Sequence, residues 1–281
     1  MKIALLFLLL LHTLYADTNT SKYDQALSLK ADEEFLSKSD KVILTNAIMG
    51  AFTITWGLTQ WDYGTDNPGS RDEGWFEAET SNGGSDKLGH FYTNYLTTRI
   101  FSPLFHSWGY STEEAALYAA MTSMIQSILF VEVGDSTSKG YGFSYQDALM
   151  DILGSIVGYY WEVYPSLSNK IDFRVEYAPD FSGPIQSDIT TDYQNMKHLM
   201  VLKAEGFTDM AVIEYFELHF GYYTRNFYHD STPVEDRERY LYAGVGINLS
   251  KLLRPVIGKY STVFNYYQTP YTYISYDKEL E

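Results

Sequence analysis

The 281-residue sequence contains no cysteine. Disulfide bonds, thiolate metal ligands and a cysteine nucleophile are therefore excluded. Basic residues are also scarce, because 20 Lys and Arg stand against 36 Asp and Glu and the formal net charge is -16. Binding to nucleic acid needs clustered positive charge, so the composition argues against a nucleic-acid partner.

Two common enzyme motifs are missing as well. Ser144 lies in the run Gly-Phe-Ser-Tyr-Gln, which lacks the second glycine of a hydrolase nucleophile elbow. The run Gly140-Tyr-Gly142 has neither the length nor the lysine of a phosphate-binding loop. The sequence therefore does not indicate a serine hydrolase or a P-loop nucleotide hydrolase.

The N-terminus has the pattern of a secretory signal. Lys2 precedes an apolar run, Ile3 to Leu11, that is too short to cross a bilayer comfortably as a helix. Small Ala16 precedes a polar run, so we expect a signal peptide over residues 1–16, with no cysteine there to carry a lipid anchor. An uncleaved membrane anchor is the alternative. The sequence thus predicts an exported protein of the periplasm or outer membrane, with a polar leader over residues 17–40.

Apolar residues at helical spacing dominate the segment 41–165. Four helices are expected, over residues 41–58, 86–100, 115–133 and 145–164. Ser102-Pro103 is expected to end the second helix. Gly154 and Gly158 have the small-xxx-small spacing that lets two helices approach closely. We therefore expect a bundle of about four apolar helices, and whether they span a membrane stays open.

After Pro165, apolar and polar residues alternate, which is typical of β-strands. Strands are expected over residues 171–177, 198–204, 215–223 and 239–249, while 257–276 is rich in aromatic residues and ambiguous. Four or five strands are too few for a closed membrane barrel. The expected fold class is therefore α+β, an N-terminal helical bundle (41–165) followed by a small antiparallel β-sheet in a β-rich tail (166–281).

Polar side chains interrupt the apolar helices at helical spacings. Three pairs do so: Asp86 with His90, Glu132 with Asp135, and Asp147 with Asp151. If the inward faces of a bundle bring them together, their carboxyl groups must bind a cation, share protons or pair with His90, Lys87 or Lys139. Helix caps and solvent-exposed faces are the simpler interpretation.

The composition of this set suggests its chemistry. One imidazole among several carboxylates favours a divalent metal such as Mg, Mn, Ca or Zn. The predicted metal ligands are Asp86, His90, Glu132, Asp135 and Asp147. The same set suits acid–base catalysis, with His90 as the base and Glu132 and Asp147 as further catalytic candidates.

The order of these motifs carries a resemblance. Asp86-Lys87-x-x-His90, Glu132 with Asp135, Gly142-x-Ser144-x-x-Asp147 and Gly154 follow one another along the chain. In this order the chain resembles the YfiM-like family of predicted periplasmic lipoproteins of unknown function, and it is distantly similar to the VanZ-like proteins, which are embedded in the inner membrane. The chain departs from these patterns in lacking a lipobox cysteine and in having Asp151 where VanZ-like chains tend to have Asn. The resemblance implies an envelope location and a single polar cluster, and it implies no reaction.

Three functions stay open for such a protein. The first is a structural or interaction protein of the envelope, in which the polar cluster fixes the packing of the bundle. The second is a metal- or acid/base-dependent hydrolase or transferase acting on an envelope lipid or glycan. The third is a module that binds an apolar ligand between bundle and sheet. The 26 Tyr and 5 Trp suit a membrane lipid or an envelope protein as partner, and the sequence does not specify the oligomeric state.

Overall fold

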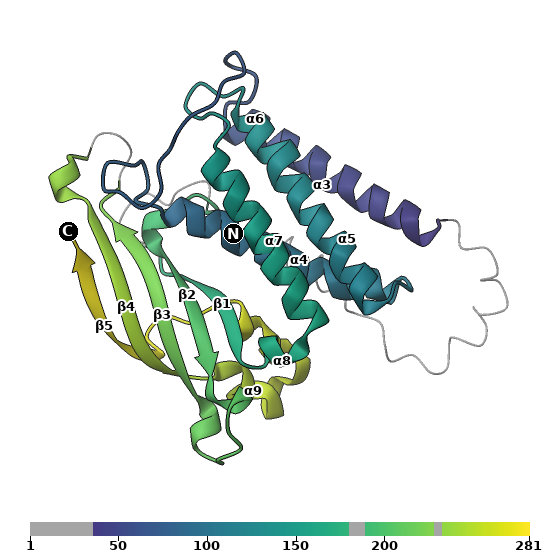
Figure 1. Ribbon diagram of the computed structural model, residues 1–281, viewed down its shortest axis with the longest axis vertical. Helices are drawn as coiled ribbons and strands as arrows, with labels where there is room; N and C mark the ends of the chain where they lie inside the picture. Colours follow the sequence, from purple (N-terminus) through teal and green to yellow (C-terminus); the bar gives the residue numbers. More distant parts are fainter. Residues whose placement is uncertain (1–35, 180–188, 228–231) are drawn as a thin grey trace.

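The computed structural model describes residues 36–179, 189–227 and 232–281. The predicted signal peptide and most of the predicted leader lie outside these residues. The helical part consists of α3 (Lys38–Gln60), α4 (Ser85–Ser107), α5 (Thr112–Met124), the π-helix η2 (Ile125–Glu132), α6 (Val133–Asp135), α7 (Tyr145–Val163) and α8 (Pro165–Ser168). Figure 1 shows these helices on one side of the molecule and the sheet on the other.

Three of the long helical segments form one packed unit. α4 lies against both α5 and α7, whereas α3 contacts mainly η2. The two glycines of α7 allow the approach to α4, because a side chain at Gly154 would overlap the carbonyl of Phe91 and one at Gly158 would overlap Thr98. α3 leaves Ile43 and Ile48 more than half exposed. The expected bundle of about four helices is therefore only partly matched, since α3 adds little to the shared core.

The sequence predicted that Ser102-Pro103 would end the second helix, and this prediction is wrong. α4 continues through Pro103 to Ser107. A proline inside a helix costs about 3 kcal/mol. The turn that follows Pro103 buries Phe105 completely, in a cluster with Ala115 and Ala119. Burial of a phenylalanine contributes roughly 1.5–3 kcal/mol, which is comparable with the cost of the proline.

The helix predicted over residues 115–133 is divided. Its first part is α5, and from Ile125 to Glu132 the chain forms a π-helix. A π-helix has more residues per turn than an α-helix, so it rotates the residues that follow it around the axis. Glu132, the last residue of η2, is 1% exposed. The change of helix type therefore places this carboxyl group inside the molecule.

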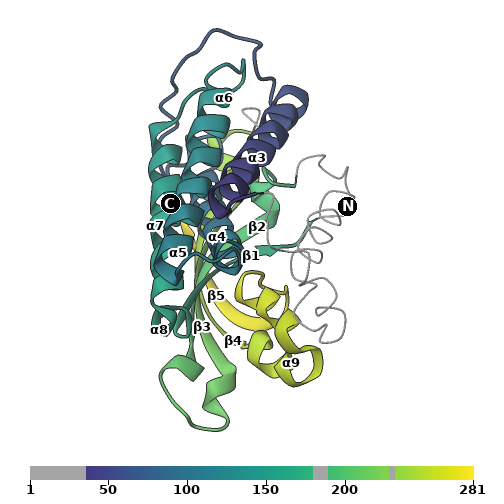
Figure 2. The ribbon, with the colours of Figure 1, turned by 90° about the vertical axis from the view of Figure 1, so that its right-hand side faces the viewer.

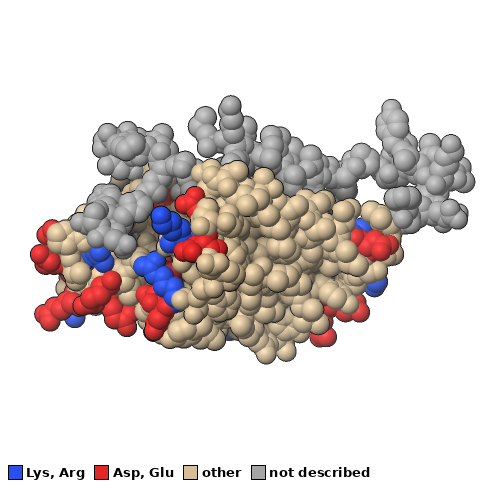
Figure 3. Space-filling view, turned by 90° about the horizontal axis from the view of Figure 1, so that it is seen from above, with Lys and Arg blue, Asp and Glu red and all other residues tan. Residues whose placement is uncertain are grey.

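Two helical segments among the described residues are long and apolar enough to cross a membrane. They are Lys38–Gln60 and Thr112–Asp135, with mean hydropathies of 1.4 and 1.5. A helix in the core of a protein passes the same test, and Thr112–Asp135 is partly buried. α3 is different, because little of it is covered by the rest of the protein. Seen from above, the middle of the molecule presents a broad surface without charged side chains (Figure 3).

The β-sheet has five antiparallel strands in chain order. They are β1 (Ile171–Tyr177), β2 (Met196–Lys203), β3 (Phe216–Arg225), β4 (Glu238–Ile247) and β5 (Tyr273–Leu280). The first four correspond to the predicted strands, whereas β5 and the preceding helices α9 (Leu249–Ile257) and η8 (Gly258–Asn265) were not predicted. Short 3-10 turns, η3 (Tyr193–Asn195), η4 (Ala204–Gly206), η5 (Ile213–Tyr215) and η7 (Val234–Asp236), lie in the connections.

A half-buried strand usually turns its polar residues to solvent, and β1 does not. One face of the sheet meets α4 (Figures 1 and 2). On this face Phe173 packs on Phe91 and Tyr95. The opposite face carries the polar residues of β1, and Asp172 and Arg174 are each only 2% exposed. The alternation in β1 therefore marks polar residues that are buried, because they pair with one another and with charged residues of the neighbouring strands.

His198 of β2 lies on the face that meets α4, with its ring centre 6.4 Å from that of Tyr92. Burial lowers the pKa of His198 to about 4, whereas histidine in an unfolded chain has a pKa of about 6.5. Below pH 6.5 the unfolded chain therefore binds a proton that the folded chain does not. We expect the protein to lose up to about 3 kcal/mol of stability from this group as the pH falls from about 6.5 to 4.

This prediction is tested by urea unfolding over that pH range, comparing the wild type with His198→Phe. The phenylalanine variant should lose less stability on acidification, because it has no imidazole to protonate. Equal losses in the two proteins would contradict the assignment.

Candidate functional site

The polar residues predicted on the helices come together at one cavity. Its volume is about 590 Å³. The acidic cluster at this cavity consists of Glu73 from the loop before α4, Asp86, Lys87 and His90 of α4, Glu132 of η2, Asp135 of α6, and Asp147 and Asp151 of α7. All five predicted metal ligands thus line a single cavity, although they come from four different helical segments.

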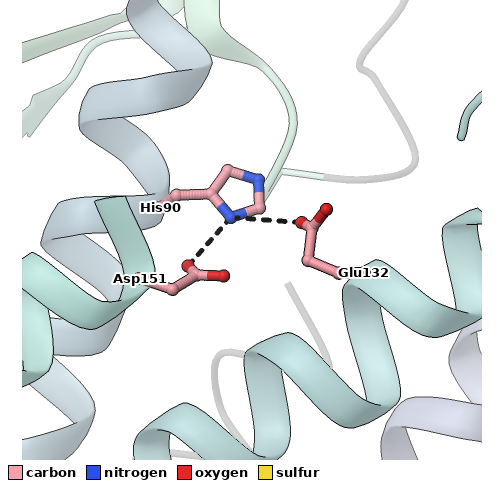
Figure 4. Close-up of side chains that lie close together, drawn as sticks. All are labelled: His90, Glu132 and Asp151. Atoms are coloured by element: carbon pink, nitrogen blue, oxygen red, sulfur yellow. Dashed lines mark hydrogen bonds and ion pairs between the residues drawn. The ribbon is translucent and has the colours of Figure 1, made fainter. Parts of the chain in front are cut away.

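Three of these side chains point toward one another (Figure 4). The distance from His90 Nδ1 to Asp151 Oδ1 is 3.0 Å, and that to Glu132 Oε1 is 3.8 Å. One ligand atom from each of the three residues lies within 4.8 Å of the others. His90 is 18% exposed, while Glu132 and Asp151 are almost fully buried. This group, the His90 triad, opens to the cavity mainly through the imidazole.

The two carboxyl groups of the His90 triad are held unequally. Oε2 of Glu132 accepts a hydrogen bond from the backbone N–H of Ser144 at 3.0 Å. Oδ1 of Asp151 accepts one from the amide of Asn94 at 2.6 Å. Oδ2 of Asp151 is buried and has no hydrogen-bond partner among the described residues. A buried, unpaired carboxylate oxygen is unfavourable unless a proton or a cation joins it.

The other half of the cluster surrounds an ammonium group. Lys87 Nζ lies 2.6 Å from Glu73, 2.9 Å from Asp86 and 2.9 Å from Asp147. Lys87 is 1% exposed. The three carboxylates keep the pKa of Lys87 above its usual value, although burial alone would lower it. The lysine therefore occupies the position that a metal ion would take among these three carboxylates.

The charges of the cluster perturb one another. Burial alone would lower the pKa of His90, but Asp151, Asp147 and Glu132 hold it well above its ordinary value. Burial raises the pKa of Glu132 to about 8 and that of Asp135 to about 7, against the opposing charge of His90. Six carboxyl groups thus face two bases, and the excess of negative charge requires protons or a cation.

Asn94, which donates to Asp151, is hydrogen-bonded to serines of three other helical segments. Oδ1 of Asn94 accepts hydrogen bonds from the hydroxyls of Ser123 at 2.6 Å and Ser127 at 2.9 Å. The same oxygen lies 3.3 Å from the hydroxyl of Ser155. Asn94 therefore joins α4 to α5, η2 and α7 next to Asp151.

Sequence reasoning missed part of this site. Asn94 lies one turn beyond His90 on the same helix, so the spacing argument could have included it. Glu73 lies in an irregular loop, where no periodicity signals its position. Asp151 was noted as a neighbour of Asp147 but was not included among the ligands. Lys139, considered as a possible partner, is exposed and forms no ion pair with the cluster in the part of the chain that the structure describes.

Residues 72–163 match the model of a family described as predicted periplasmic lipoprotein (DUF2279). The match covers the loop and helices that carry every member of the acidic cluster. The description is consistent with the exported location, periplasm or outer membrane, that the N-terminus predicts. The chain has no cysteine and therefore lacks the residue that anchors a bacterial lipoprotein. No curated protein and no solved structure matches the chain.

Proposed function

We propose that the protein is a cation-dependent hydrolase or transferase of the cell envelope that acts on an envelope lipid or glycan. The cation would be held by the His90 triad. The observation that carries this proposal is the unpaired, fully buried Oδ2 of Asp151 at a site where an imidazole and a second buried carboxyl group converge. Such a group is unfavourable in the folded protein without a positive partner.

The distances in the triad are close to those of a metal site, and the contact between His90 Nδ1 and Asp151 Oδ1 is a hydrogen bond in the absence of a metal. Metal–ligand bonds of about 2.1 Å place neighbouring ligand atoms roughly 3.0–3.4 Å apart. His90 Nδ1 lies 3.0 Å from Asp151 Oδ1 and 3.8 Å from Glu132 Oε1. Of these two separations, only that between His90 and Glu132 has to shorten for both residues to bind one metal ion. The donor set of one nitrogen and carboxylate oxygens suits Mg, Mn, Ca or Zn.

The cavity beside the triad supports a catalytic role for the cluster. Its volume of about 590 Å³ is in the range of ligand sites in proteins. A divalent cation at its wall would polarise a carbonyl or phosphoryl oxygen, or activate a water molecule. Asp147, whose Oδ2 lies 3.9 Å from His90 Nε2, and Asp135 also line the cavity and are the candidates for moving protons there.

The second candidate is a structural or interaction protein of the envelope, in which the polar cluster fixes the packing of the helices. The hydrogen bonds of Asn94 favour it, because they tie the buried end of the cluster to α5, η2 and α7. A polar network of this kind specifies one packing of the helices without any chemistry. Membrane lipid is the proposed partner in either case, given the exposed apolar side chains of α3. The resemblance to YfiM-like and VanZ-like proteins supports an envelope location for either role, and it favours neither role over the other.

The proposal is tested by the metal content of protein purified without chelator, measured by mass spectrometry. The wild type should contain a stoichiometric divalent cation, and His90→Ala and Glu132→Ala should each lose it. Glu113→Ala is the matched control, because Glu113 is an exposed carboxylate in the first turn of α5. Circular dichroism would show whether the variants fold. Metal-free wild type, with both site variants merely less stable than the control, would favour the structural role.

A further inference from the structure

An apolar groove of about 630 Å³ lies between the helices and the sheet, separate from the acidic cluster. Leu88 and Phe91 of α4 and Met150 and Leu153 of α7 form one wall. His90 of the acidic cluster lies on a different side of α4 and does not line this groove. The groove and the acidic cluster are therefore two separate sites, and a ligand in the groove does not depend on the function proposed for the cluster.

The floor of the groove is a straight row of neighbours across the sheet. The row runs Phe173, Met200, Phe220, Ala243, Tyr276, and each residue is the register partner of the next. All five line the groove. Five strands at about 4.8 Å spacing make this row roughly 19 Å long. The groove therefore has the length and the apolar lining for one extended hydrocarbon chain.

The groove offers little to a peptide. Its floor is the middle of the sheet, where the backbone groups of β2, β3 and β4 are paired on both sides, so no strand can be added there. Of its polar side chains, Tyr92 and Tyr222 donate their hydroxyls to the backbone carbonyls of Tyr266 and Gly83. His198 leaves one ring nitrogen without a hydrogen-bond partner among the described residues. An occupant with few hydrogen-bonding groups is therefore favoured.

One end of the groove carries an exposed positive charge. Lys278 on the edge strand β5 lines the groove, is exposed, and forms no ion pair among the described residues. Its register partner is Leu241, in the row next to the one described above. Tyr276, beside it on the same strand, is 75% exposed, so the groove opens to solvent at this end. The opposite end, at Phe173, is closed by Phe91 and Trp161.

We infer that this groove binds the acyl chain of a single-chain anionic lipid, with the methyl end near Phe173 and the headgroup at Lys278. The apolar row takes the hydrocarbon, and the lysine takes the negative charge where the groove opens. The protein thus has a lipid-binding site besides the acidic cluster.

The test is native mass spectrometry and calorimetric titration of the full mature chain with 1-palmitoyl-lysophosphatidylglycerol below its micelle concentration. The neutral probe 1-monopalmitoylglycerol is the comparison. The wild type should bind one molecule of the anionic lipid. Ala243→Trp, which fills the row between Phe220 and Tyr276, should weaken binding of both probes by about tenfold or more, because several methylene groups lose their contacts. Val256→Trp, at an 80% exposed site on α9, is the matched control and should bind like the wild type.

The charge is tested separately. Lys278→Glu should weaken binding of the anionic lipid by about fivefold or more and leave the neutral probe nearly unchanged. Failure of the wild type to bind, or unchanged binding by Ala243→Trp, would overturn the inference. So would a concentration-dependent dimer that Ala243→Trp dissociates, because the groove would then be an interface between two copies of the chain.

Discussion

Replacing Lys87 by Met is expected to lower the free energy of unfolding by about 3–5 kcal/mol at neutral pH, because breaking a buried ion pair leaves uncompensated charge. The ammonium group lies between Glu73, Asp86 and Asp147 and is shielded from solvent. Methionine keeps the length and the apolar stem of the side chain, so the charge is the main loss. The measurement is urea unfolding in the presence of a chelator.

The exposed Lys139 supplies the control. Lys139→Met should change stability by less than about 0.5 kcal/mol, as surface substitutions usually do. The loss in Lys87→Met should also shrink as the pH is lowered toward 5, since burial raises the pKa of Glu73 and this carboxyl group then takes up a proton. Magnesium or calcium ions should restore part of the stability at neutral pH, because these carboxylates could then hold a metal. A loss below about 1 kcal/mol would mean that the lysine is not the counter-ion of this group.

Arg174→Met is expected to have an effect of similar size, about 3–5 kcal/mol. The guanidinium of Arg174 donates two hydrogen bonds to Glu217, at 2.8 and 2.7 Å, inside the polar face of the sheet. Burial alone would raise the pKa of Glu217, but His219 and Arg174 hold it below its usual value. Without the arginine, Glu217 must stay charged and poorly paired or take up a proton.

Urea unfolding of the single and double variants tests this pair. Arg174→Met with Glu217→Gln should recover much of the stability that the single variant loses, because no unpaired charge is left. Arg254→Met, at an exposed arginine of α9, should be close to the wild type. If the double variant is no more stable than Arg174→Met alone, the loss comes from packing and not from the charge of Glu217.

Local patterns in the sequence predicted much of the helical half. The apolar spacing identified α3 and α7, and the alternation after Pro165 identified four of the five strands. Asp86, His90, Asp147 and Asp151 were paired by their one-turn spacing, which depends only on the geometry of an α-helix. These predictions succeeded because each depends on residues that are close together in the chain.

Long-range packing decided the features that the sequence missed. The continuation of α4 past Pro103 depends on the burial of Phe105 against another helix. The π-helix that brings Glu132 inward has no signal in its apolar sequence. Glu73 joins the cluster from a loop, and β5 pairs with β4 from a segment whose aromatic residues suit helix and strand alike.

The sequence by itself determined that the protein has no thiol chemistry, carries a large negative charge and has the pattern of an exported chain, because these properties depend on composition and on one terminal segment. It also determined which polar residues share a helix face. Only the tertiary structure decided that six carboxyl groups meet around Lys87 and His90, that Asp172 and Arg174 are buried, and that an apolar groove crosses the sheet. The reason is that burial and pairing depend on which distant segments come into contact, and periodicity within a single segment carries no information about its partner.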